Sequence, residues 1–128
     1  MKQRILVIGA GFGGMWTALS ATRLFDIHGH NDVEVTVLAP QAELRVRPRF
    51  YESNAHQLAA PIGDVAHRER GAGAGGAAET IDVEQKRVGY VDAQGEKQVC
   101  IYDKLVLATG SRLALPDTPG VVEHAFDV

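Results

Sequence analysis

The chain has 128 residues, of which 45% are hydrophobic, and this balance is typical of one compact globular domain rather than a disordered chain. Lys and Arg together number 13 and Asp and Glu number 16, so the net charge of −3 argues against nucleic acid as the main partner. The one cysteine, Cys100, excludes an intramolecular disulfide framework and favours a reducing, cytoplasmic setting.

The first third of the chain predicts a strand, a glycine-rich turn, a helix and a second strand. Residues 5–8 form an aliphatic run that suits a strand buried on both faces of a parallel sheet. Apolar residues then recur at helical spacing up to about Ile27, where the polar turn of residues 28–32 begins. Residues 33–38 form the second strand. This order is one βαβ unit with a right-handed crossover.

The remainder of the chain predicts a loop, a helix and several short strands. A loop is expected at 40–48 and a helix at 50–60, whereas the Gly- and Ala-rich residues 70–78 are interpreted as a flexible loop. Further strands are expected at 79–82, 87–91, 98–101 and 103–108, with a turn at 92–95. The fold class predicted is α/β, a Rossmann-like parallel sheet with a small antiparallel β-meander.

No apolar run is long enough to cross a membrane, and the run that follows the first four residues is also too short for the core of a secretory signal. We therefore expect no transmembrane segment. The expected protein is soluble, or peripheral with an anchor that lies elsewhere.

The spacing G-x-G-x-x-G occurs twice, at residues 9–14 and at residues 71–76. The first copy follows a buried strand and opens a helix, so Gly9 would permit the tight turn, Gly11 would let a pyrophosphate approach the backbone, and Gly14 would let the helix pack closely. The N-terminus of that helix offers N–H groups and a partial positive charge to phosphates. The second copy follows no strand, so we interpret it as part of the flexible loop.

The end of the second strand departs from the usual dinucleotide pattern. An acid at this position commonly holds a ribose hydroxyl, but the strand here ends in Leu38, Ala39 and Pro40. No Arg follows at once either, so a preference for a 2′-phosphate is not indicated. The ribose is then held by backbone or water, or the affinity for the dinucleotide is reduced.

Three stretches together resemble the pyridine nucleotide–disulfide oxidoreductase superfamily, and within it the type II NADH dehydrogenases. They are the turn IGAGFGG after its apolar strand, the segment VTVLAPQAELRVRPRFYE, and the segment YDKLVLATGSRLALPDTPG. The resemblance spans nearly the whole chain. It implies FAD rather than NAD over the glycine turn, with the A-T-G turn closing on the same cofactor.

The resemblance also implies individual cofactor positions. Arg47 and Pro48 correspond to a segment near the flavin ring, a strand near Ala78 would offer its backbone to adenine, and Ala39 stands where relatives have the ribose-binding acid. No catalytic side chain and no metal site is implied, and the first helix lacks the paired cysteines of disulfide reductases. The cofactor-binding positions implied are Gly9, Gly11, Phe12, Gly13, Gly14, Ala39, Arg47, Pro48, Ala78, Ala108, Thr109 and Gly110.

The parent activity that the resemblance implies is hydride transfer from NAD(P)H to FAD, followed by transfer of electrons from the flavin to an acceptor such as a quinone. Residues 1–128 are expected to be the N-terminal portion of an FAD-binding domain, without the NAD(P)H domain and the C-terminal domain. A dinucleotide-binding module without turnover and an ordinary NAD-binding dehydrogenase domain stay open as alternatives. So do a homo-oligomer, completion by another chain, and peripheral attachment of the full-length parent to a membrane.

Four side chains outside these motifs have an ordinary interpretation. Trp16, just after the glycines, is expected to pack in the core. Cys100 is expected to be a small apolar packing residue rather than a nucleophile. His28 and His30 are interpreted as polar loop residues rather than metal ligands.

Overall fold

The computed structural model describes residues 2–41, 43–45, 59–61, 72–111, 114 and 116–124, and its main body is one six-stranded sheet with a long helix. The strand order in this sheet is β7-β6-β5-β2-β1-β8, and a separate two-stranded sheet pairs β3 with β4. The strands are β1 (Gln3–Ile8), β2 (Val33–Ala39), β3 (Glu43–Arg45), β4 (Ala59–Pro61), β5 (Ala72–Asp82), β6 (Arg87–Asp92), β7 (Lys97–Ile101) and β8 (Lys104–Leu107). The helices are α1 (Phe12–Ile27) and the short α3 (Val121–His124).

The sheet has a parallel part and an antiparallel part, as the α/β prediction requires. Strand β1 pairs in parallel with β2 on one side and with β8 on the other. Strand β5 belongs to both parts, because its first residues pair in parallel with β2 and the rest pairs antiparallel with β6. Strand β7 then pairs antiparallel with β6 and completes the meander.

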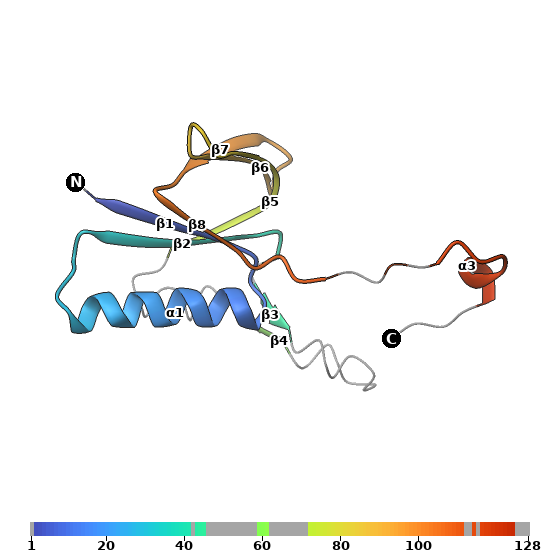
Figure 1. The fold of residues 1–128 in the computed structure, drawn as a ribbon, viewed down its shortest axis with the longest axis horizontal. Helices are drawn as coiled ribbons and strands as arrows, with labels where there is room; N and C mark the ends of the chain where they lie inside the picture. Colours follow the sequence, from blue (N-terminus) through green and yellow to red (C-terminus); the bar gives the residue numbers. More distant parts are fainter. Residues whose placement is uncertain are drawn as a thin grey trace.

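Strands β1 and β2 are covered on both faces, which explains their unbroken aliphatic sequences. Helix α1 lies along one face, and the meander of β5, β6 and β7 rises from the other (Figure 1). Under the helix, Val7, Val35 and Val37 pack against Met15 and Ala18. On the meander side, the core cluster consists of Leu6, Ile8, Leu38, Val88 and Tyr102. The alternating residues of β1 and β2 therefore serve two different cores.

The end of helix α1 and the turn before β2 lie where the sequence predicts them. Helix α1 ends at Ile27, and its buried residues include Met15, Ala18 and Thr22. The hydroxyl of Thr22 donates to the carbonyl of Ala18 at 2.9 Å, so this buried polar group is satisfied inside the helix. The turn before β2 contains Gly29 at φ +70, a conformation that favours glycine.

The prediction of a flexible loop at residues 70–78 is wrong for the described part of that segment, because β5 runs from Ala72 to Asp82. Its glycines allow close packing rather than disorder. A Cβ on Gly76 would lie 2.5 Å from Cδ2 of Tyr90 and 2.7 Å from the carbonyl oxygen of Val91. The Tyr90 ring therefore occupies the place of the missing side chain, which is a common reason for glycine within a strand.

Other expectations have mixed outcomes. The turn at 92–95 is confirmed, since the Asp92 carboxylate accepts hydrogen bonds from the N–H groups of Gln94 and Glu96 at 3.0 and 2.9 Å. Strand β8 exists, but it is not buried on both faces: it is the last strand of the order and Leu107 is 62% exposed. The helix expected at 50–60 lies outside the described residues, except that residues 59 and 60 belong to the strand β4.

Candidate functional site

The carboxyl ends of β1 and β8 meet at the glycine turn that leads into α1. Gly9 has φ +110, and its N–H donates to the carbonyl of Leu38 at 2.9 Å. A Cβ on Gly9 would overlap the carbonyl oxygen of Ala108. Both the backbone angle and the neighbouring strand therefore require glycine here.

Gly14 is required for a different reason, because the helix touches the turn at this residue. A Cβ on Gly14 would overlap the carbonyl oxygen of Gly9 and would lie 3.4 Å from the Cβ of Ala108. The first turn of α1 is therefore held directly against the backbone that leaves β1. This close contact fixes where the N-terminus of the helix lies.

Gly11 and Gly13 differ from the other two glycines, because nothing lies within 4 Å of a Cβ built on either. Gly11 is the N-cap, with φ −73 and ψ −173, and no side chain caps the helix. The first helical hydrogen bond runs from the N–H of Met15 to the carbonyl of Gly11, so the N–H groups before Met15 have no acceptor within the helix. The open space over Gly11 and Gly13 thus lies at the positive end of the helix dipole, beside backbone N–H groups that have no acceptor within the helix.

The segment after β8 lies beside this turn. The N–H of Ala108 donates to the carbonyl of Ile8 at 2.8 Å, which continues the pairing of β1 with β8 to the end of both strands. Thr109 is exposed, and Gly110 has φ +74. The structure therefore brings Ala108, Thr109 and Gly110 together with the glycine turn, although the two segments are about a hundred residues apart in the sequence.

The strand order places this turn at a topological switch point. The chain leaves β1 toward β2 and β5 on one side, whereas β8 occupies the other side of β1. In open α/β sheets the crevice outside the carboxyl ends of the strands at such a point is the usual ligand position. The geometry suits a ligand that carries phosphate groups.

The other predicted positions are spread along the same edge or lie outside the described residues. Ala39 ends β2, is 7% exposed, and pairs with Gly75 of β5. Ala78 lies three residues beyond Gly75 on β5, opposite Tyr90 and just before a register shift. Arg47 and Pro48 lie outside the described residues, so their relation to the turn stays a prediction.

Gly75 is a position that the sequence analysis missed. It is exposed, and a Cβ on it would meet nothing within 4 Å, so it leaves open space beside the end of β2. The only sequence signal was its place in the second G-x-G-x-x-G, which we interpreted as a loop.

The prediction for Trp16 is wrong, because this side chain is 65% exposed. The residue lies on the face of α1 that points away from the sheet, together with the 45% exposed Phe12 one turn earlier. The two aromatic side chains therefore stand on the outside of the helix whose N-terminus forms the turn.

The described groups with a shifted pKa include Cys100 on the meander and Asp103 beside the start of β1. Burial raises the pKa of the Cys100 thiol above its ordinary value of 9.0, against a smaller lowering by the hydrogen bond with Tyr90. Cys100 packs against the meander core, as the sequence analysis predicted. At the other end of β1, hydrogen bonds from the side chain and then the N–H of Arg4 lower the pKa of Asp103. Among the described residues, no three His, Cys, Asp or Glu side chains gather in a way that could hold a metal ion.

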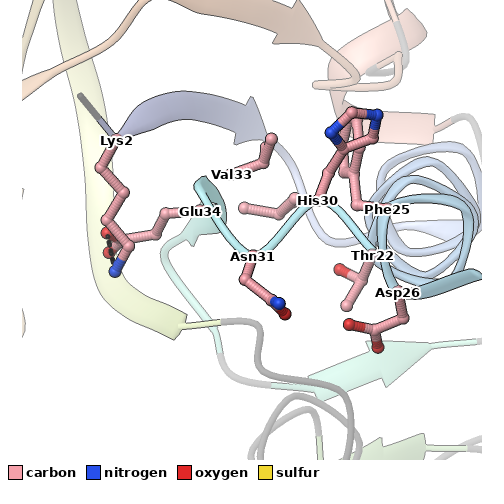
Figure 2. A pocket seen from close by; sticks show the side chains of 9 residues that line it. Lys2, Thr22, Phe25, Asp26, His30, Asn31, Val33 and Glu34 are labelled. Carbon is pink, nitrogen blue, oxygen red and sulfur yellow. Dashed lines mark ion pairs between the residues drawn. The ribbon is translucent and has the colours of Figure 1, made fainter. Parts of the chain in front are cut away.

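A pocket of about 210 Å³ lies near the opposite ends of the parallel strands (Figure 2). It lies between the C-terminal part of α1 and the start of β2, and Lys2 and Glu34 on its rim form an ion pair of 3.2 Å. Its lining mixes apolar groups such as Phe25 and Val33 with polar groups such as Thr22. None of the predicted site residues that the structure describes lines it.

Comparison with known proteins decides the family. The family model for pyridine nucleotide-disulphide oxidoreductases matches residues 3–128. The chain belongs to this family. It is 37% identical over 129 aligned residues to an NADH dehydrogenase-like protein of Mycobacterium tuberculosis, covering 98% of this chain and 31% of the relative. A demethylphylloquinone reductase of Synechocystis is 25% identical and is covered to 32%.

Solved structures agree on the fold. NDH2 from Plasmodium falciparum in complex with NADH matches with a TM-score of 0.76 at 19% identity, over 96% of this chain and 25% of that one. The sulfide:quinone oxidoreductase of Aquifex aeolicus matches with a TM-score of 0.72 at 24% identity, over 94% of this chain and 27% of that one. This chain thus spans about a third or less of the length of these relatives. None of the helices in the described part of the chain is long and apolar enough to span a membrane.

Proposed function

We propose that this chain is the N-terminal part of the FAD-binding domain of a flavin-dependent NAD(P)H oxidoreductase, and that the turn of residues 9–14 holds the pyrophosphate of FAD. The observation that carries this proposal is the contrast among the glycines. Backbone closes on Gly9 and Gly14, whereas the space over Gly11 and Gly13 is open at a helix N-terminus. This arrangement of residues 9–14, called the cradle below, suits phosphate groups that approach backbone N–H groups.

Family membership and the second segment of the site support FAD as the dinucleotide. Residues 108–110 resemble the A-T-G turn that closes on FAD in relatives, and here they lie against the glycine turn. The positions proposed to contact FAD are Gly9, Gly11, Phe12, Gly13, Gly14, Ala39, Arg47, Pro48, Ala78, Ala108, Thr109 and Gly110.

When bound, FAD would supply the chemistry of accepting a hydride and passing its electrons on to an acceptor. The residues of this chain have the simpler tasks of binding and orientation. The N–H groups of Gly13 and Gly14 would donate to the pyrophosphate, and the α1 dipole would favour its negative charge. The thiol of Cys100 is not proposed as an acid or base for a redox step, because burial raises its pKa and it packs against the meander core.

The partners of the full protein are part of the same proposal. Similar proteins carry the names NADH dehydrogenase-like protein and demethylphylloquinone reductase, which favours NAD(P)H as electron donor and a quinone as acceptor. A cytoplasmic protein, peripheral at a membrane where its quinone resides, fits these partners.

The test is a calorimetric and fluorescence titration of the folded chain with FAD and, separately, with NAD. We expect saturable FAD binding that is lost in Gly11→Val. At Gly11 the φ of −73 suits any residue and a Cβ meets no atom, so this variant should fold normally while it fills the cradle. Ser20→Val adds a branched side chain to an exposed position of the same helix and is the matched control, which should bind FAD like the wild type.

The other outcomes are equally informative. Preferential binding of NAD would favour an ordinary NAD-binding dehydrogenase domain. Steady oxidation of NADH by the FAD-loaded chain would exclude a dinucleotide-binding module without turnover. If the folded chain binds neither nucleotide, the proposal is wrong.

A further inference from the structure

Among the described residues, the end of β2 lacks the carboxylate that commonly accepts a hydrogen bond from a ribose hydroxyl. Ala39 is the last residue of the strand, and it is followed by the uncharged, exposed Pro40 and Gln41. In dinucleotide-binding βαβ units, an acid at this position accepts a hydrogen bond from the ribose 2′-hydroxyl, and its charge disfavours a 2′-phosphate. The methyl group of Ala39 does neither.

The neighbouring strand does not supply the missing group. Ala39 pairs with Gly75, which has no side chain and open space where a Cβ would be. One strand further, the register brings Asp92 opposite Gly76. Both oxygens of that carboxylate are already engaged, because Oδ1 accepts from the N–H groups of Gln94 and Glu96 and Oδ2 accepts from Gln98 at 3.1 Å. Asp92 closes its own turn and does not replace the ribose acid.

We propose that this site does not read the 2′ position of the adenosine ribose, and that residue 39 sets this tolerance. The inference rests on the proposed function, since it assumes that the glycine turn holds a nucleotide pyrophosphate. The site then holds the ADP moiety through its phosphates and through backbone contacts, without a charged contact to the 2′ position. Selection between FAD and NAD then falls to contacts with the half of the dinucleotide beyond the pyrophosphate, whereas NAD and NADP, which differ only at the 2′ position, are not distinguished by residue 39.

Calorimetric titration with three probes tests this inference directly: ADP, 2′-deoxy-ADP and ADP that carries a 2′-phosphate. The wild-type chain is expected to bind all three with dissociation constants within about threefold of each other, because no charged hydrogen bond distinguishes them. In Ala39→Glu the introduced carboxylate should favour ADP over both analogues by about tenfold or more, as a charge-assisted hydrogen bond does. Ala39→Gln has the same length without the charge, and it should not reject the 2′-phosphate.

The results separate this inference from the proposed function. If the wild type binds ADP at least about tenfold more tightly than either analogue, the site does read the 2′ position and the inference is wrong, while the proposed function stands. If the folded wild type binds neither ADP nor FAD, the proposed function fails and this inference fails with it. Because Ala39 is buried, circular dichroism must show that each variant folds; if Ala39→Glu does not, the three wild-type titrations decide the matter.

Discussion

The contact between the first turn of α1 and the glycine turn gives the sharpest prediction for stability, which is tested by Gly14→Ala. In most helices this change is favourable, by about 0.5–1 kcal/mol, because alanine restricts the unfolded backbone. Here the new Cβ would overlap the carbonyl oxygen of Gly9 and lie 2.9 Å from its carbonyl carbon. The obstacle is backbone rather than the end of a flexible side chain, so the helix must move away from the strand.

The expected cost follows from this overlap. Overpacking a well-packed site costs about 1–3 kcal/mol, and a clash with backbone belongs at the upper end of that range. After the helix-forming gain of alanine is subtracted, we expect a net destabilisation of about 1–2 kcal/mol. Gly13→Ala is the matched control, because it introduces the same group one residue earlier where nothing lies within 4 Å. It should be neutral or slightly stabilising, by less than about 1 kcal/mol.

The assay is urea denaturation of wild type, Gly13→Ala and Gly14→Ala, followed by circular dichroism at constant pH and salt. The quantity compared is the free energy of unfolding in water at equal m-value. If Gly14→Ala is as stable as Gly13→Ala, the helix is not held against the turn, and the description of the cradle is wrong.

Three further predictions concern other parts of the fold. Asp103 accepts hydrogen bonds from the Arg4 side chain and N–H, and these lower the pKa of Asp103 in the folded chain below the ordinary 3.8. Its contribution to stability is therefore fully present above pH 3.8 and is lost as the pH falls through the lowered pKa. The free energy of unfolding should therefore fall less steeply with decreasing pH in Asp103→Asn than in the wild type. The same pH dependence in both proteins would contradict the role of the Arg4–Asp103 pair. Gly76→Ala should destabilise by about 1–3 kcal/mol through its clash with Tyr90 and Val91, whereas Gly75→Ala should not, as chemical denaturation of both would show. Finally, Met15→Ala should lower the free energy of unfolding by about 2–5 kcal/mol, because Met15 is buried. Trp16→Ser changes a 65% exposed position and should alter the free energy of unfolding by no more than about 0.5 kcal/mol. If thermal melts show equal losses of stability in the two variants, Trp16 is packed in the core.

Sequence alone could predict the βαβ unit because its aliphatic runs, its glycines and its polar turn all indicate the same elements. The aliphatic runs of β1 and β2 are buried on both faces, and the small residues between them form the turn. The helix boundary at Ile27 follows from the polar turn after it. The meander could also be predicted from its alternating strands and from the turn that Asp92 closes.

The remainder depends on partners that lie far away in the sequence. Residues 72–76 show no hydrophobic periodicity, so nothing in the local sequence indicates a strand. Their conformation depends on pairing with β2 and β6, and the ring of Tyr90 packs against Gly76. The exposure of Trp16 depends on which face of α1 the sheet covers, and the helix is too apolar all round to show this. The relation of Ala39 to Gly75 is a matter of register, which only the paired strands reveal.

The central claim is that a dinucleotide pyrophosphate lies over the N-terminus of α1, and amide NMR tests it most directly. Nitrogen–proton spectra of the labelled chain should be recorded during titration with FAD. The account predicts that the largest changes fall on the amides of Gly11, Gly13 and Gly14, with Gly110 beside them. Changes confined to the pocket near Lys2 and Thr22, or no changes in a well-dispersed spectrum, would contradict it.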